Sequence, residues 1–243
     1  MRQKLTHALA AALAMFIVAP AFADGPGDAG PDVAAPPVRA QPQAPSSAPE
    51  WRTGQFGLGD LSINGAEGYV FYPASEAYAF MQRNNASSPP GAVLGLIARQ
   101  DANVRAPGAW ATVVSYDAIG YVQGETASGL EESGFEASVR QARSAQNRAF
   151  EGFAFSPTFQ AEDPPSLTWA ERAARPGSAG ADMRFEQRML GRYGVAGLTS
   201  IGSADQLTQI QAAADRLKGM LSFPQGRRHA EFEPASDQVS AYS

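Results

Sequence analysis

Few side chains of this chain could carry out catalysis without a cofactor. Its 243 residues include two histidines, and only His229 lies outside the first 23 residues. A serine, His229 and Asp237 can be written as a hydrolytic triad, although no G-x-S-x-G motif accompanies them. The chain has no cysteine, which excludes a thiolate nucleophile and a zinc–thiolate site. We therefore expect no metal and no cofactor, and we keep a hydrolase that uses His229 with a nearby carboxylate such as Asp237 as the alternative hypothesis.

Arg192 lies between Gly191 and Gly194 in the segment LGRYGV, and two glycines so close together predict unusual backbone dihedral angles. A guanidinium held at such a turn could bind an anion or a partner. The same side chain could instead fix the turn by donating hydrogen bonds to carbonyl groups or to a carboxylate. We favour the second interpretation and keep Arg192 as a candidate binding residue.

Four further residues are candidates for binding a ligand or a partner: Tyr121, Asn147, Arg148 and Trp169. Trp169 could line a ligand groove together with Trp110, but large aromatic side chains in strands usually belong to the core. Asn147 and Arg148 are expected at the end of a helix, where capping or ion pairing explains them. Solvation and helix dipoles suffice to explain a further set of carboxylates, namely Glu131, Glu132, Glu162 and Asp163.

The first 23 residues are typical of a secretory signal peptide. Arg2 and Lys4 form the charged region, an apolar stretch runs from Leu9 to Val18, and Ala21-Phe22-Ala23 is a cleavage signal before Asp24. A run of about 14 apolar residues is short for a membrane span of about 20, so we expect cleavage between Ala23 and Asp24. The sequence therefore predicts an exported protein, periplasmic or secreted, or associated with the cell envelope.

Residues 24–50 contain seven of the eighteen prolines, with Ala, Gly, Gln and Ser between them and almost no large apolar side chain. Such a segment cannot bury enough surface to offset the entropy of ordering it, which predicts a disordered or polyproline-like leader. The leader could be a spacer or could contain a recognition motif, and we favour the spacer.

The charge of the mature chain restricts its partners. Removing Arg2 and Lys4 with the signal leaves 17 basic and 24 acidic side chains, a net charge of −7. A surface this acidic argues against nucleic acid or anionic lipid as the main partner. No later segment is apolar for long enough to cross a bilayer, so we expect no transmembrane span in the mature chain.

Residues 51–243 are predicted to form one domain. Because the strands do not alternate regularly with helices, we expect an α+β fold with a largely antiparallel sheet and two or three packed amphipathic helices. Ser75 is expected to cap the first helix, and Ser203 and Gln206 to form a capping box before the last. Strands are expected over 56–63, 68–72, 92–98, 109–116, 152–158, 167–174, 183–190, 195–201 and 228–232, and helices over 75–84, 133–149 and 207–221.

Two of these elements carry expectations about their faces. Over 183–190 we favour a strand in which Met183, Phe185 and Met189 point into the core, although Phe185, Met189 and Leu190 would also suit a short helix. In the helix over 133–149, one face should bury Phe135, Val139, Ala142 and Ala149, and the other faces should carry polar side chains, namely Arg140, Arg143, Gln146 and Arg148.

Several short motifs occur in a recognisable order: Gly120-Tyr121-Val122, Asn147-Arg148, Gly152-Phe153 with Pro157, Leu167-Thr-Trp169-Ala170, LGRYGV over 190–195, and Phe223-x-x-Gly226-Arg-Arg-His229-Ala-Glu-Phe232 with Asp237-x-Val239-x-Ala241-Tyr242. This ordered set resembles the bacterial domain of unknown function 2167 family, described as predicted membrane-anchored proteins, over roughly residues 54–242. The resemblance implies an exported envelope protein with no assigned reaction. Members usually continue into a hydrophobic C-terminal segment, whereas this sequence stops at Ser243.

The export signal, the resemblance and the scarcity of catalytic side chains lead to one main hypothesis. We expect a non-enzymatic module that binds an envelope protein or a small envelope ligand.

Overall fold

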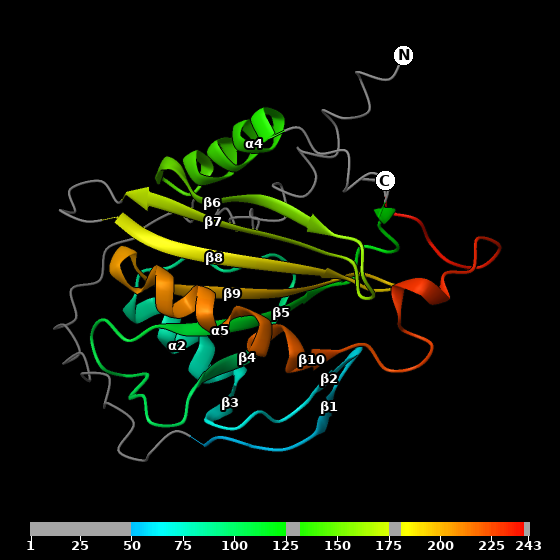
Figure 1. Ribbon diagram of the computed structural model, residues 1–243, viewed down its shortest axis with the longest axis horizontal. Coiled ribbons are helices and arrows are strands. Elements are labelled where there is room, and N and C mark those ends of the chain that lie inside the picture. Colours follow the sequence, from blue (N-terminus) through cyan, green and yellow to red (C-terminus); the bar gives the residue numbers. More distant parts are fainter. Residues whose placement is uncertain (1–49, 125–131, 175–180, 241–243) are drawn as a thin grey trace, which may run out of the picture.

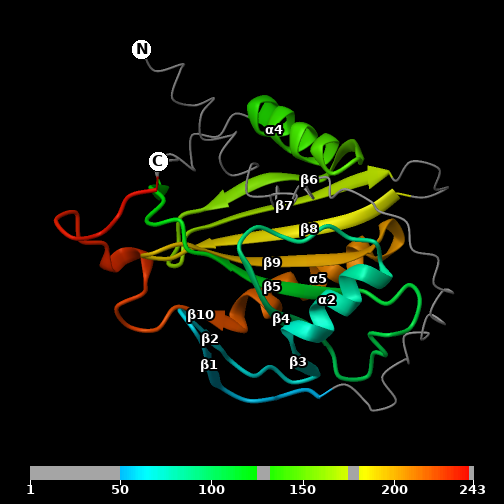
Figure 2. The ribbon, with the colours of Figure 1, turned by 180° about the vertical axis from the view of Figure 1, so that it is seen from behind.

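The computed structural model describes residues 50–124, 132–174 and 181–240, and the chain forms two antiparallel sheets flanked by helices (Figures 1 and 2). The predicted signal peptide, its cleavage site at Ala23 and Asp24, the leader up to residue 49, Glu131 and Tyr242 lie outside the described residues. The described part confirms the α+β class and the largely antiparallel sheet.

The main sheet has seven strands in the order β3-β4-β5-β9-β8-β7-β6, and every neighbouring pair is antiparallel. Its strands are β3 (Tyr69–Pro73), β4 (Ala92–Arg99), β5 (Ala111–Asp117), β6 (Ala149–Gln160), β7 (Ser166–Ala174), β8 (Ala181–Leu190) and β9 (Val195–Ser203). A second sheet has the order β1-β2-β10, with β1 (Phe56–Leu58), β2 (Leu61–Ile63) and β10 (Leu221–Ser222).

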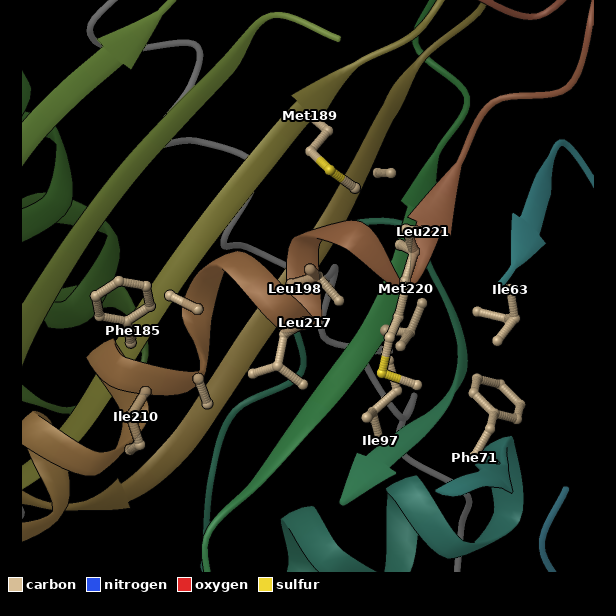
Figure 3. Packing of buried hydrophobic residues seen from close by; sticks show 14 of the residues in the cluster. Ile63, Phe71, Ile97, Phe185, Met189, Leu198, Ile210, Leu217, Met220 and Leu221 are labelled. Carbon is tan, nitrogen blue, oxygen red and sulfur yellow. The ribbon is translucent and has the colours of Figure 1, made fainter. Parts of the chain in front are cut away.

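Helices cover both faces of the main sheet. Helix α5 (Leu207–Gly219) packs on one face, over β8 and β9, and closes the largest core cluster together with the small sheet (Figure 3). Helices α2 (Ala74–Arg83) and α4 (Glu132–Ala145) cover the other face, α2 against β3 and β4 and α4 against β6. Met183, Phe185 and Met189 all point into the α5 core, which confirms the predicted inward face of β8.

The start of α5 is confirmed in detail. The backbone N–H of Ser203 donates to Oε1 of Gln206 at 2.9 Å, so Gln206 reaches back as the capping box requires. A short 3₁₀ turn over Ala204–Gln206 precedes the helix. The start of α2 was predicted wrongly, because Pro73 and not Ser75 occupies the cap position. Proline suits a helix start, since its φ is already helical and it has no N–H to leave unpaired.

Two predicted strands differ in the structure. Residues 56–63, expected as one strand, form the hairpin β1–β2, which turns at Gly59 and Asp60. Residues 228–232 are not a strand, because His229–Glu231 is a 3₁₀ turn. The Glu231 carboxylate accepts hydrogen bonds from the backbone N–H groups of Gly226 and Arg228, at 2.7 and 3.0 Å. These local bonds curl the chain and compete with strand pairing.

Candidate functional site

Four of the candidate residues, Arg192, Tyr121, His229 and Asp237, meet at one end of the main sheet. The segment Phe223–Ser240, called the C-terminal segment below, passes beside the β8–β9 connection and beside Tyr121. Backbone hydrogen bonds fix it there: the Arg192 N–H donates to the Arg227 carbonyl at 2.9 Å, the Tyr121 N–H to Gln238 at 2.9 Å, and the Ser240 N–H to Tyr121 at 2.8 Å. Motifs from distant parts of the sequence are therefore neighbours in space.

Arg192 holds Asp237 through two hydrogen bonds. Its Nε donates to Oδ2 at 2.6 Å and its Nη2 to Oδ1 at 2.9 Å, and the Glu233 N–H also donates to Oδ2 at 2.8 Å. The hydrogen bonds from Arg192 lower the pKa of Asp237 below its usual value. One edge of the guanidinium, formed by Nε and Nη2, is thus engaged by both carboxylate oxygens, and this geometry is that of an arginine that fixes a turn.

The two glycines beside Arg192 do not have the unusual dihedral angles that we expected, since neither is among the positive-φ residues. They provide space instead. A Cβ on Gly191 would lie 2.4 Å from the Phe223 ring, and a Cβ on Gly194 would lie 2.1 Å from the Asp117 carbonyl oxygen. The absent side chains let the C-terminal segment and the end of β5 approach the β8–β9 connection closely.

His229 takes part in a stack of three rings. Its ring lies 4.4 Å from that of Tyr121, and the Tyr121 ring lies 3.8 Å from that of Phe232 on the other side. The His229 Nε2–H donates to the Val122 carbonyl at 2.8 Å, because a carbonyl can only accept. Among the described residues, no hydrogen bond joins His229 to a carboxylate. The geometry therefore does not assemble the triad written from the sequence.

We expect Asp237→Asn to loosen the C-terminal segment without unfolding the sheet. An amide cannot accept two charge-assisted bonds from Arg192, so the amides of Tyr121 and Ser240 should exchange with deuterium faster than in the wild type. Hydrogen exchange with peptide resolution measures this. Asp101→Asn is the control, because Asp101 pairs with Arg99 on the open surface, and it should leave those amides unchanged. Equal exchange in both variants would contradict a fixing role for Asp237.

The other three candidates lie elsewhere. Asn147 follows α4 with a positive φ of 55°, and Arg148 pairs with Asp182 at 2.9 Å, at the start of β8 and thus at the opposite end of that strand from Arg192. Arg148 also donates to the Asn85 carbonyl. Trp169 is fully buried between β7 and α4, where it contacts Phe135 edge to face at 5.1 Å.

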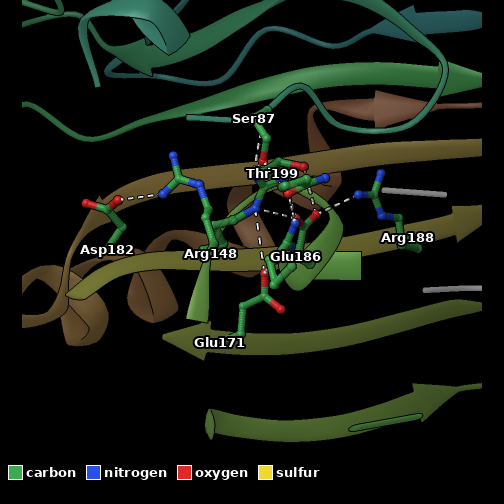
Figure 4. A network of polar contacts seen from close by, with 10 residues as sticks. Ser87, Arg148, Glu171, Asp182, Glu186, Arg188 and Thr199 are labelled. Atoms are coloured by element: carbon green, nitrogen blue, oxygen red, sulfur yellow. Dashed lines mark hydrogen bonds and ion pairs between the residues drawn. The ribbon is translucent and has the colours of Figure 1, made fainter. Parts of the chain in front are cut away.

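The structure also contains a buried charged cluster that the sequence analysis missed. The cluster consists of Arg143, Glu171, Arg184, Glu186 and Arg188, and all five side chains are buried on the α2–α4 face of the sheet (Figure 4). We expected Arg143 on a solvent-facing side of its helix, and that expectation was wrong. It lies four residues after Val139 and so shares the buried face.

The charges in this cluster alternate along a chain of contacts. Arg143 donates to Oε1 of Glu171, and Arg184 lies next, 3.8 Å from that oxygen and 2.9 Å from Oε1 of Glu186. Arg188 then donates to Oε2 of Glu186 at 2.8 Å, and Thr199 donates to the same oxygen at 2.7 Å. Each buried carboxylate is thus near two arginines.

Glu186 occupies the centre of the charged cluster. Burial raises the pKa of its carboxyl, but the charges of Arg188, Arg184 and Arg143 and the Thr199 hydrogen bond outweigh burial and lower the pKa to about 2. Asp117 is not part of the cluster, and desolvation raises its pKa by more than the charge of Arg188 lowers it. Glu186 is therefore ionised across the physiological pH range and does not act as a proton acceptor there.

Three arginines against two glutamates leave an excess positive charge in the cluster, and some atoms around it are unsatisfied. Among the described residues, Oε2 of Glu171, Nε of Arg188, Nε1 of Trp169 and Oγ of Ser115 are buried without a hydrogen-bond partner. Each such atom costs about 1–3 kcal/mol. In the described part of the chain, no group of three or more His, Asp or Glu side chains is placed to hold a metal ion.

An accessible concave surface lies at the opposite side of the molecule from α4. It is a groove of about 610 Å³ between the small sheet and the β3–β4 edge, called the Trp51 groove below. Trp51 is 47% exposed, whereas the Phe56 ring is partly buried and packs edge to face on Phe71 at 5.4 Å. The remaining lining is mostly apolar and comprises Glu50, Arg52, Leu58, Pro73, Ala74 and Leu94. Sequence analysis missed this groove, although Trp51 marked the start of the domain.

Comparison with known proteins places the chain in a family. The model of the family described as Protein of unknown function (DUF2167) matches residues 51–243, which confirms the resemblance drawn from the motifs. No curated protein matches the chain. The solution structure of cyanobacterial PsbP (CyanoP) from Synechocystis sp. PCC 6803 is similar over 74% of this chain and 96% of that chain, with 8% identity and a TM-score of 0.40. Because the family model covers well over half of its length, the chain belongs to the DUF2167 family of proteins of unknown function.

Proposed function

We propose that this protein is an exported, non-enzymatic binding module of the cell envelope and that the Trp51 groove is its binding surface. The observation that best supports this proposal is the groove. Its volume of about 610 Å³ lies within the range of about 300–1,000 Å³ found for ligand sites. Its lining is apolar and aromatic with the guanidinium of Arg52 beside it, which is the usual composition of a recognition site.

The residues with catalytic potential support a binding function because their polar atoms are engaged within the chain. Asp237 accepts from Arg192 and from the Glu233 backbone, and the Nε2–H of His229 donates to a backbone carbonyl. Among the described residues, the groove lining contains no histidine, and Glu50 is its one carboxylate. These contacts favour binding over the alternative hydrolase.

Export rests on the first 23 residues, which have the pattern of a secretory signal peptide. No helix of the described residues is long and apolar enough to cross a membrane. We expect the full-length chain to be found in the periplasmic or envelope fraction of its native host. A chain that begins at Asp24 should stay in the cytoplasm.

The groove is tested by removing one exposed aromatic side chain. We expect Trp51→Ser to abolish capture of the envelope partner by the purified protein, because the indole is the largest apolar surface that the groove presents. Tyr78→Ser is the matched control, since Tyr78 is 49% exposed and lies on α2 outside the groove lining. The wild type and the two variants are each incubated as bait with an envelope extract, and the retained proteins are compared by mass spectrometry.

The outcome is read from the difference between the two variants. A protein retained by the wild type and by Tyr78→Ser but lost with Trp51→Ser supports the groove. Retention that is equal for all three baits would assign binding to another surface.

A further inference from the structure

We propose that the proline-rich leader of this chain docks into the Trp51 groove of the same molecule and thereby competes with the partner. The occupant is the stretch from Pro36 to Pro45, and the residues from Ser46 to Pro49 connect it to the domain. This inference rests on the proposed function only in taking the groove as a binding surface. It adds that the leader competes with the partner for the groove, so release of the leader regulates whether the partner can bind.

The lining of the groove suits a polyproline helix. Trp51 supplies an exposed ring and Phe56 a partly buried one that packs on the buried Phe71. The Arg52 guanidinium lies 5.6 Å from the Phe56 ring centroid. Aromatic-lined grooves recognise proline-rich segments because such segments are already extended and lose little entropy when they bind. Pro73, Leu58 and Leu94 extend the apolar surface beyond the rings.

The neighbouring sheet edge disfavours docking by strand addition. β3 is an edge strand of the main sheet, and Arg52 already pairs with Phe71 through two backbone bonds of 2.8 and 2.9 Å. Pro73, two residues further along β3, has no N–H to donate. An incoming segment must therefore dock through its side chains, and a polyproline helix is the backbone conformation that needs no ladder of hydrogen bonds.

The leader has the composition and position for this role. Pro36, Pro37, Pro42, Pro45 and Pro49 lie within fifteen residues of Glu50, and Pro42-Gln-Ala-Pro45 has the spacing P-x-x-P. Glu50 itself lines the groove, so the leader joins the domain at the site. The five residues after Pro45, up to Glu50, reach at most about 16 Å at 3.1 Å per residue, and Ser46 and Ser47 among them allow the chain to reverse. A tether this short gives an effective concentration on the order of millimolar.

Tryptophan quenching tests the docking directly. Trp51 is 47% exposed, whereas Trp110 and Trp169 are 8% and 0% exposed, so acrylamide reaches Trp51 selectively. The protein starting at Asp24 is compared with a variant in which the five prolines between 36 and 49 are serines. We expect the quenching slope of the wild type to be about half that of the variant or less, because a mostly occupied groove shields the indole. The difference should not change with protein concentration. Trp51→Phe should remove the quenchable component in both backgrounds.

Each result decides the proposal. Equal slopes for the wild type and the proline variant would overturn it, and so would shielding that grows with protein concentration, which would mean that a second copy supplies the leader. The same measurements distinguish failure of leader docking from failure of the proposed binding function. If the slopes are equal but capture of a partner still depends on Trp51, the groove binds a partner and the leader is a spacer. If the indole is shielded but no partner depends on Trp51, the leader docks in a groove with no other ligand.

Discussion

Replacing Glu186 with glutamine is expected to lower the free energy of unfolding by about 3–5 kcal/mol, the cost of breaking a buried ion pair. Glu186 accepts from Arg184, Arg188 and Thr199, and all of these side chains are buried. Glutamine has nearly the same shape, but it carries no charge and presents N–H donors to guanidinium groups. The charged cluster would then hold three arginines against Glu171 alone.

Denaturant titration near pH 7 measures this loss, and Glu136→Gln is the control. Glu136 pairs with Arg140 at 2.6 Å, but both side chains are exposed on α4. Exposed pairs four residues apart on a helix contribute about 0.3–0.5 kcal/mol, so the control should unfold almost like the wild type. A Glu186→Gln protein as stable as that control would mean that the arginines find other partners, and the cluster would then not be a unit.

The pH dependence supplies a second measurement on the same residue. The pKa of Glu186 is about 2 in the folded protein against an ordinary value of 4.5, so the unfolded state binds a proton more readily. The stability that Glu186 contributes is therefore fully present above about pH 4.5 and is lost as the pH falls toward 2. The wild type should lose stability over this interval more steeply than Glu186→Gln. Parallel curves would show that other carboxyls dominate acid unfolding.

The strand that carries Glu186 shows which features could be predicted from the sequence. The apolar positions of β8 alternate, and this period predicted both the strand and its inward residues Met183, Phe185 and Met189. The intervening Arg184, Glu186 and Arg188 were overlooked, because polar residues at alternate positions normally face water in an antiparallel sheet. Here the face opposite α5 is covered as well, by Arg143 of α4, which donates to Glu171, and by the segment at Ser87, whose carbonyl accepts from Arg184. Those three side chains are therefore buried. Whether a second layer covers a polar face depends on elements far away in the sequence.

At the end of the sheet, too, local features could be predicted and contacts between distant residues could not. The capping box at Ser203 and Gln206 could be predicted because both partners lie within four residues. The stack of Tyr121 between His229 and Phe232 could not, since more than one hundred residues separate Tyr121 from the other two rings. Arg192 illustrates an intermediate case. The glycines around it indicated a special site, but the reason is close approach of distant segments and not local backbone conformation.

Replacing Gly194 with alanine is expected to lower the free energy of unfolding by about 3 kcal/mol, at the upper end of the range for overpacking. The new Cβ would lie 2.1 Å from the Asp117 carbonyl oxygen and 3.0 Å from the Ala118 Cα. These are backbone atoms, so no side chain can rotate away and β5 must separate from the β8–β9 connection. The Gly120 N–H, which donates to the Tyr193 carbonyl at 3.0 Å, would move with it.

Gly57→Ala is the control, because it replaces a glycine by alanine without creating a steric clash. Gly57 lies in β1 with ordinary backbone angles and nothing within 4 Å of its ideal Cβ, so this variant should differ from the wild type by less than about 0.5 kcal/mol. Hydrogen exchange should also show faster exchange at Tyr121 and Ser240 in Gly194→Ala, because the C-terminal segment pairs with the part of the chain that must move. If Gly194→Ala has the same free energy of unfolding as Gly57→Ala, the β8–β9 connection can move away from β5 without loss of stability. The close approach of these segments would then not be what requires a glycine in LGRYGV.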